Sequence, residues 1–357
     1  MLKYVLHKLG YALLTLFGVV TVVFFLFTVL PGDPAKMMLG QNQSEEQLAV
    51  VRAKYGFDEP LITQYLYYLN DLSPLSVHST NPADYTYSEE GKYNALSLFT
   101  IENFTLVVKT PYLRESFQKN GKEVSAVIGE TLPNTIILAI CAIGIALLLG
   151  IFLGIISALN KDTWIDRTIQ VLSTVGMSVP SFFSAIIFAW LFGFVLHEFT
   201  HLNMTGSLYE LDDFGEENVL KLKNLILPAV VLGIRPLAVV VQLMRNSLLE
   251  VLQQDYIRTA KAKGLSMSRI IRKHALKNSM NPVVTTISGW FASMLAGAVF
   301  VEYIFGWNGL GKEIVEALNK LDLPVIMGAV LTIATTFILI NILVDVMYGW
   351  LDPKVGR

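Results

Sequence analysis

Cysteine and charge are both scarce in this sequence. The chain of 357 residues holds one cysteine, Cys141, so no disulfide can form within it. Only 16% of the residues are charged, whereas 53% are hydrophobic, and the mean hydropathy is +0.53. No internal repeat or low-complexity tract is evident. A disulfide framework is therefore excluded, and the composition places the chain in a lipid bilayer.

Six apolar segments are long enough to cross a bilayer. They lie at Leu9–Leu30, Thr131–Leu159, Thr168–Leu196, Leu225–Met244, Val283–Val301 and Val325–Tyr348. Basic residues precede the first segment, as they would in a signal peptide, but its apolar part is too long and no small-residue cleavage site follows it. We therefore expect it to remain as a membrane span. The sequence predicts an all-α membrane protein with six transmembrane helices.

The positions of Lys and Arg predict the orientation of these spans. With the N-terminus inside, the inner segments carry 14 basic and 5 acidic residues, and the outer segments carry 12 basic and 23 acidic residues. The net charge of −2 conceals this asymmetry. Both chain termini, and the loop between the fourth and fifth spans, are expected on the cytoplasmic side.

Three regions follow from this arrangement. Residues 1–30 are the N-terminal tail and first helix, residues 31–125 are an extracytoplasmic region, and residues 126–357 are a five-helix core. The core includes an inner loop at about 246–278. The extracytoplasmic region is too long for a plain connector.

Turn and cap signals predict local structure within residues 31–125. Ser44 followed by Gln47 is typical of a capping box, and the short helix after it ends at Gly56. Asp58 is expected to cap a second helix, which opens at Pro60. This helix is rich in Tyr and is expected to lie on the membrane surface. A small mixed subdomain is expected from residue 71 to residue 125.

Small residues and prolines mark expected contacts and bends in the spans. Gly150-x-x-x-Gly154 and Ser293-x-x-x-Gly297 each place small residues on one helix face, which favours close packing within the chain over dimerisation. Three prolines are expected to break ideal helices and to suit a bundle around a path: Pro180, Pro228 and Pro236.

A zinc-protease pattern, H-E-x-x-H, occurs at His197-Glu198-x-x-His201. On a helix the two histidines would share a face and Glu198 could act as a base, with Glu210 or Asp212 proposed as a further ligand. The pattern fixes only three positions and lies where the third span ends. An amphipathic helix end with interfacial histidines is the favoured interpretation, and no metal site is expected.

A near match to a phosphate-binding loop, "GWNGLGKE", runs from Gly306 to Glu313. Glu313 stands where the magnesium-binding hydroxyl should be, and no strand precedes the motif. We expect a loop turned by glycines, and no nucleotide site or other cofactor on this chain.

A compact basic block separates the fourth and fifth spans. From Arg245 to Lys277 there are eight Lys or Arg residues and two acids. Gly264 separates two helix-patterned stretches, which predicts a helix, a glycine turn and a second helix. Such a block could lie on lipid, but a fixed turn between two short helices favours a docking surface for a cytoplasmic partner. Its place between two spans excludes nucleic acid as the partner.

The block resembles the cytoplasmic "EAA" loop of permease subunits in binding-protein-dependent ABC importers. "DYIRTAKAKG" followed by "HALKN" is similar to the branch that imports dipeptides, oligopeptides and nickel, although the Glu, Ile and Pro of the general motif are absent. "LPGDPA", "TLPNT", "VPSF", "VEYIFGWNGLGKEIVEAL" and "DVMYGWLDP" extend this resemblance over nearly the whole chain, except about residues 71–123.

The resemblance implies a fold, partners and a mechanism. It implies a type I ABC importer permease in a bacterial cytoplasmic (inner) membrane, paired with a second permease subunit, two ATPase subunits that hold ATP and Mg, and an extracytoplasmic substrate-binding protein. It also implies that the loop docks on the ATPase through Arg258, Thr259, Ala260, Lys261, Gly264, Leu265, Met267, Arg272 and His274. Peptides are the expected substrate, with nickel chelates or another small solute as the alternative. A secondary transporter or a membrane zinc protease would be the competing classes.

One arginine, Arg235, lies near the centre of the fourth span. A charge at that depth costs about 2.5–3.5 kcal/mol on insertion scales, so Arg235 must face protein or water. A structural hydrogen bond to backbone carbonyls and a place on the translocation path or against a second permease subunit remain as alternatives.

Overall fold

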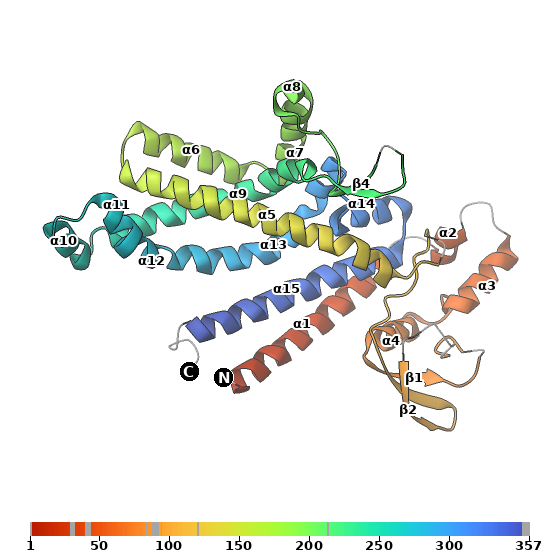
Figure 1. Ribbon diagram of the computed structural model, residues 1–357. Helices are drawn as coiled ribbons and strands as arrows, with labels where there is room; N and C mark the ends of the chain where they lie inside the picture. The colour runs from red at the N-terminus through yellow and green to blue at the C-terminus, as the bar shows by residue number, and fades with distance from the viewer. Residues whose placement is uncertain are drawn as a thin grey trace. The chain divides into compact units, whose positions relative to one another are not determined.

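The computed structural model describes residues 2–28, 33–39, 44–82, 84–87, 93, 95–119, 121–212 and 214–351 (Figure 1). The chain divides into two compact units. Unit 1 comprises Met1–Glu130 and Glu316–Thr335, and unit 2 comprises Thr131–Val315 and Thr336–Arg357. The predicted division at residues 30 and 125 stays a prediction.

The membrane helices agree with the predicted spans in number but not in shape. Four helices are long and apolar enough to cross a membrane: α1 (Leu2–Thr28), α5 (Val124–Leu159), α9 (Lys223–Val251) and α15 (Leu323–Leu351). Two bent pairs bring the number of spans to six if each pair is one span. One pair is α6 (Trp164–Ser178) with the segment Ser181–Val195, and the other is formed by the two halves of α13 (Asn281–Phe305).

The predicted break of the third span at Pro180 is confirmed. Its two parts meet at 109° around Pro180, because proline cannot continue a helix through the residue before it. After the bend come α7 (Ser181–Trp190), a π-helical turn η1 (Leu191–Val195) and α8 (His197–Thr200). The predicted breaks at Pro228 and Pro236 are wrong, because both residues lie inside α9, which continues through them.

Unit 2 is built around α9. This helix is the most buried of the four straight spans, and it packs against α6, α7 and α13. Gly150 and Gly154 of α5 face Val240 and Met244 of α9, which confirms that this small-residue motif serves packing within the chain. A two-stranded sheet of β4 (Tyr209–Leu211) and β5 (Asn218–Leu220) precedes α9. After α9 come α10 (Asp255–Ala262), α11 (Met267–Ile270), η2 (Ile271–Ala275) and α12 (Leu276–Ser279). Another helix, α14 (Leu310–Lys320), follows α13.

Replacing Gly154 by alanine is expected to lower the free energy of unfolding by about 1–3 kcal/mol through overpacking. A Cβ atom there would lie 2.7 Å from the Cβ of Met244 and 3.0 Å from the carbonyl oxygen of Val241. Gly297→Ala is the matched control, because a Cβ at Gly297 meets nothing within 4 Å. Thermal unfolding in detergent measures both. Equal effects of the two changes would contradict the packing account.

Unit 1 joins membrane helices to a small α/β subdomain. It contains α2 (Pro34–Leu39), α3 (Glu45–Tyr55) and α4 (Leu61–Leu72), followed by β1 (Leu75–Ser79), β2 (Ala95–Ile101) and β3 (Phe104–Lys109). The strands form one antiparallel sheet in the order β1-β3-β2, which confirms the predicted mixed subdomain.

The predicted caps in this unit are partly confirmed. Ser44 and Gln47 form a capping box, and Gly56 ends α3 in the left-handed conformation at φ +67°. The prediction that Asp58 caps α4 is wrong, because Pro60 occupies the N-cap position without a side-chain hydrogen bond. Gln64 instead reaches back to the carbonyl oxygens of Phe57 and Glu59.

Buried acids hold unit 1 together. Asp71 is 1% exposed and accepts a hydrogen bond from Nε of Arg114 at 2.9 Å and one from the hydroxyl of Tyr85 at 3.1 Å. Burial raises the pKa of Tyr85 above its usual range, so this hydroxyl keeps its proton as a donor. At the start of α15, Asp322 accepts hydrogen bonds from the backbone N–H groups of Phe117 and Gln118.

Candidate functional site

The basic block folds as predicted, into a helix, a glycine turn and a second helical stretch. Gly264 adopts φ +75°, the left-handed region that an L side chain adopts only with strain, and its N–H donates to the carbonyl oxygen of Lys261. A Cβ atom built at Gly264 meets nothing within 4 Å. The turn therefore needs glycine for its backbone, and the space around it is open.

The buried side of this loop packs against the membrane helices. Ile257, Ala260, Ile270 and Ala275 are at most 6% exposed and belong to one cluster with Met244 of α9 and neighbouring apolar side chains. The hydroxyl of Tyr256 also accepts a hydrogen bond from Asn278 at 2.8 Å, which ties α10 to α12. The loop is thus packed against α9 and, through Val283, against α13.

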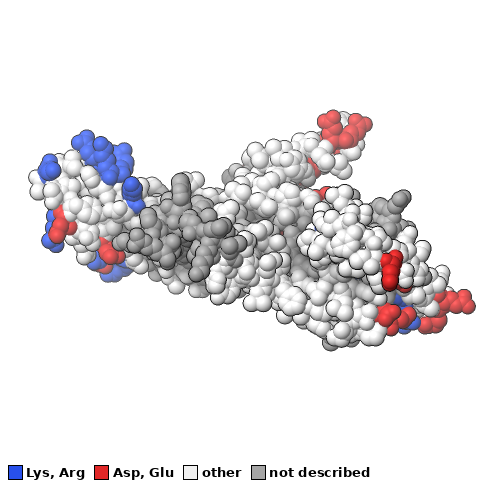
Figure 2. Space-filling model, turned by 90° about the horizontal axis from the view of Figure 1, so that it is seen from below, with Lys and Arg blue, Asp and Glu red and all other residues white. Residues whose placement is uncertain are grey.

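The solvent-exposed side of the loop carries most of the predicted coupling residues. Six of them are exposed: Arg258, Thr259, Lys261, Gly264, Met267 and Arg272. Leu265 and His274 are half-buried, and Ala260 lies on the buried side of α10. Figure 2 shows Lys and Arg side chains gathered at the end of unit 2 where α10 and α11 lie. The loop therefore presents a basic, solvent-accessible surface, and its opposite side is packed in the apolar cluster with α9.

Arg245 differs from the other basic residues of the block. Its Nε and Nη2 atoms donate to the two carboxylate oxygens of Asp166 at 2.7 and 2.6 Å. The Asp166 side chain is 4% exposed and also accepts hydrogen bonds from Ser157 and from the N–H of Asp162. This pair locks α9 to α6, and sequence reasoning missed it because it placed Arg245 among the docking charges.

Arg235 lines a cleft between α7, α9 and α13. It is exposed, and no hydrogen bond or ion pair is formed by its guanidinium within the described residues. The cleft is also lined by Ser181, Leu232, Pro236, Trp290, Ser293, Met294 and Gly297. The second small-residue motif, Ser293 to Gly297, thus borders open space. The structural hydrogen bond considered for Arg235 is not formed to any described residue.

The glycine-rich segment that resembles a phosphate-binding loop encloses a carboxylate instead. Oε2 of Glu302, which is fully buried, accepts a hydrogen bond from the N–H of Gly311 at 2.7 Å. Trp307 donates from Nε1 to the carbonyl oxygen of Asn134, and Asn134 donates to the carbonyl oxygen of Asn308. The prediction of a loop turned by glycines is confirmed. This loop joins the start of the second span to the end of the fifth through these hydrogen bonds.

The zinc-protease pattern does not lie on one continuous helix. α8 ends at Thr200, and His201 follows it with φ +53°, so the two histidines do not share a helix face. His197 contacts the carbonyl oxygen of Leu202 through Nδ1, and Glu210 accepts a hydrogen bond from Asn224. Within the part of the chain that the structure describes, no group of three His, Cys, Asp or Glu side chains is placed to hold a metal ion.

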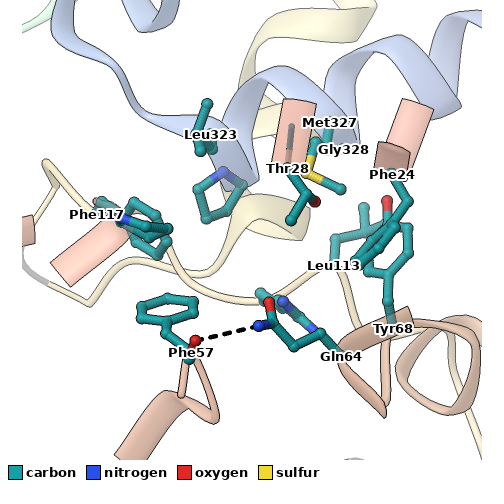
Figure 3. A pocket seen from close by; sticks show the side chains of 13 residues that line it. Phe24, Thr28, Phe57, Gln64, Tyr68, Leu113, Phe117, Leu323, Met327 and Gly328 are labelled. Carbon is teal, nitrogen blue, oxygen red and sulfur yellow. Dashed lines mark hydrogen bonds between the residues drawn. The ribbon is translucent and has the colours of Figure 1, made fainter. Parts of the chain in front are cut away.

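A second, mostly apolar pocket lies within unit 1 (Figure 3). It is formed by the end of α1, by α4, by the segment before α5 and by the first turns of α15. Phe24, Phe57, Phe117 and Met327 supply apolar walls, and Gln64 is held at its rim by a hydrogen bond to Phe57. It lies apart from the basic loop in the sequence and shares no residue with the Arg235 cleft.

The fold and these sites define a multi-pass helical membrane protein with an exposed basic loop braced against its spans. Residues 150–357 match the family model described as "Binding-protein-dependent transport system inner membrane component", and residues 1–81 match the model of the N-terminal part of such a component. The chain belongs to this family. It is therefore a transport component and not an enzyme.

Individual relatives match over the whole chain. A dipeptide transport system permease protein from Alkalihalophilus pseudofirmus is 33% identical over 99% of both chains. A dipeptide transport system permease protein from Escherichia coli is 34% identical over 99% of both chains. Among solved structures, an inward-facing MetNI methionine ABC transporter is similar with a TM-score of 0.43 and 14% identity, covering 61% of this chain and 97% of the other.

Proposed function

We propose that this chain is the transmembrane permease subunit of an ATP-driven importer of peptides. The observation that carries this proposal is the identity of 33–34% over 99% of the chain with dipeptide transport permeases. Two of the sites described above support it: an exposed basic loop suited to docking on an ATPase, and a cleft among the spans that contains Arg235.

In this proposal the exposed side of the basic loop docks on an ATPase subunit. Arg258, Lys261 and Arg272 face solvent and would pair with acidic groups of the ATPase, with Arg258 exchanging its exposed contact to Asp255, while Met267 is 42% exposed and offers an apolar contact. ATP-driven closure of the ATPase pair would move α10 and α11 and, through their buried side, α9 and α13. The spans would then open alternately to the two sides.

The assembly would contain this chain, a second permease subunit, two ATPase subunits and a substrate-binding protein. ATP and Mg would bind the ATPase subunits. The excess of Lys and Arg on one side of the spans supports an orientation in a bacterial inner membrane with both termini and the basic loop in the cytoplasm.

Mass spectrometry of proteins that co-purify with the chain from its native membrane in mild detergent tests this assembly. An ATPase, a second permease and a substrate-binding protein are the expected partners. A chain that purifies alone would contradict the proposal.

Arg235 is proposed to line the path. Arg235→Gln is expected to lower peptide uptake several-fold while the complex assembles normally, because a guanidinium that has no partner among the described residues can pair with the carboxylate of a peptide in the cleft. Arg235→Lys is the matched control, since it keeps the charge. Uptake into proteoliposomes and the yield of intact complex are the measurements. Uptake that is unchanged in Arg235→Gln would rule out a required charge at this position.

A further inference from the structure

The register of the three-stranded sheet in unit 1 sorts its side chains onto two faces, because directly paired residues of antiparallel strands point to the same side. Besides Ser79, which pairs with Phe104 and is 3% exposed, one side carries eight apolar residues, here named the apolar sheet face: Leu75, Val77, Leu96, Phe99, Ile101, Phe104, Leu106 and Val108. Seven of these eight side chains are between 42% and 76% exposed, and Leu106 is half-buried. No charged residue belongs to this face.

The opposite face of the same sheet is polar and partly buried. Ser76 is 2% exposed, His78 is fully buried and Lys109 is 5% exposed. Ser76 and His78 are hydrogen-bonded at 2.9 Å, His78 contacts the carbonyl oxygen of Thr86, and Lys109 lies over the ring of Tyr93. A sheet in water normally buries its apolar face and exposes its polar face. This sheet does the reverse, so its apolar face must meet something other than water.

The sheet is held rigidly to a membrane span. The side-chain amide of Asn70 in α4 exchanges two hydrogen bonds of 2.9 Å with the backbone of Val77 in β1. Tyr65 of α4 in turn lies 2.6 Å from the hydroxyl of Thr21 in α1, and its ring packs on Phe24. The sheet thus has a fixed position near the end of α1 that carries Thr28.

The apolar surroundings at that position are those of the bilayer. α1 is a candidate membrane span, and Phe17, Val22 and Leu26 on its surface are more than half exposed. Ile62 and Leu66 of α4, the helix between α1 and the sheet, are also exposed, at 62% and 57%. Exposed apolar side chains therefore continue from the lipid-facing helix through α4 to the sheet.

We propose that the apolar sheet face rests on the lipid leaflet at the Thr28 end of α1, in contact with acyl chains and the glycerol region. Lipid fits this face better than a transient protein partner, because a partner that leaves would return the whole face to water in every cycle. The bilayer covers the face permanently. The contact gives the subdomain a fixed height above the membrane and does not depend on the substrate or on the orientation of the chain.

Spin labels on the two sides of β2 test this contact. With Cys141→Ser as background, Leu96→Cys places a nitroxide on the apolar face and Ser97→Cys places one on the opposite face of the same strand, where Ser97 is also exposed. The labelled chain is purified with its native partners and reconstituted into phosphatidylethanolamine and phosphatidylglycerol vesicles. Collision rates with oxygen, which concentrates in lipid, and with a water-soluble nickel chelate are then compared.

We expect the ratio of oxygen to nickel collision rates to be several-fold higher for the Leu96 label than for the Ser97 label. A Leu96 label that collides freely with nickel would overturn the proposal by placing the face in water. Shielding from both reagents would overturn it in favour of a protein cover. Ile101→Cys, on the same face, provides a second site if Leu96→Cys is unstable. None of these outcomes depends on uptake or ATP hydrolysis, so they are independent of the proposed transport function.

Discussion

Replacing Gly264 by tryptophan is expected to lower peptide uptake strongly while ATP hydrolysis continues. The backbone at Gly264 has φ +75°, so any L side chain there costs about 1–2 kcal/mol. Because a Cβ atom at this position meets nothing in the chain, the fold should survive. The indole would project into the surface that we propose contacts the ATPase. Loss of a coupling free energy of about 1–3 kcal/mol corresponds to roughly a 5- to 150-fold loss of coupled uptake.

Two variants separate the causes of this effect. Gly264→Ala adds the backbone strain with almost no bulk, and we expect it to lower uptake only slightly. Lys263→Trp adds the same bulk one residue earlier, at an exposed position with φ −78°, and we expect it to retain most of the uptake. Uptake and ATP hydrolysis are measured in the same proteoliposomes. Normal uptake by Gly264→Trp would refute the docking assignment.

Removing the carboxylate of Asp166 is expected to cost about 3–5 kcal/mol of stability, because it leaves the guanidinium of Arg245 partly buried and unpaired. The pair is bidentate, and its side chains are 4% and 18% exposed. The double variant Asp166→Asn with Arg245→Gln should lose less than the sum of the two single changes, because it leaves no unpaired charge.

A surface pair in the same loop is the matched control. Asp255 and Arg258 lie 3.5 Å apart with side chains that are 96% and 75% exposed, so Asp255→Asn should change stability by at most about 1 kcal/mol. The stability of each variant is measured by unfolding it in detergent with heat or denaturant. If Asp166→Asn were no more destabilising than Asp255→Asn, the Asp166–Arg245 pair would not lock α6 to α9.

Membrane spans and the basic loop could be predicted from the sequence because their signals are local. A run of apolar residues of sufficient length specifies a span, and Gly264 between two helix-patterned stretches specifies a turn. The break at Pro180 was predicted, but the angle of 109° between its two parts was not, because hydropathy is averaged over a window and does not record direction. A proline signal was present there, but the same signal at Pro228 and Pro236 produced no break.

The remaining features depend on contacts between distant parts of the chain. Asp166 and Arg245 are 79 residues apart, and nothing local indicates that they pair. The burial of Ala260 follows from its place in a cluster with Met244 of α9 and Ile270 of α11, which lie far from each other in the sequence. The reversed polarity of the sheet was also hidden, since the alternation in β1 shows two kinds of side chain without showing which faces the interior.

ATP-driven uptake of a labelled dipeptide tests the central claim most directly. The complex purified from the native membrane is reconstituted into proteoliposomes with its ATPase subunits facing the medium, and the substrate-binding protein and dipeptide are enclosed inside. We predict that adding ATP and Mg releases the labelled dipeptide into the medium only when the binding protein is present, and that Gly264→Trp lowers this release roughly 5- to 150-fold. Release that follows an ion gradient without ATP, or that needs no binding protein, would contradict the account.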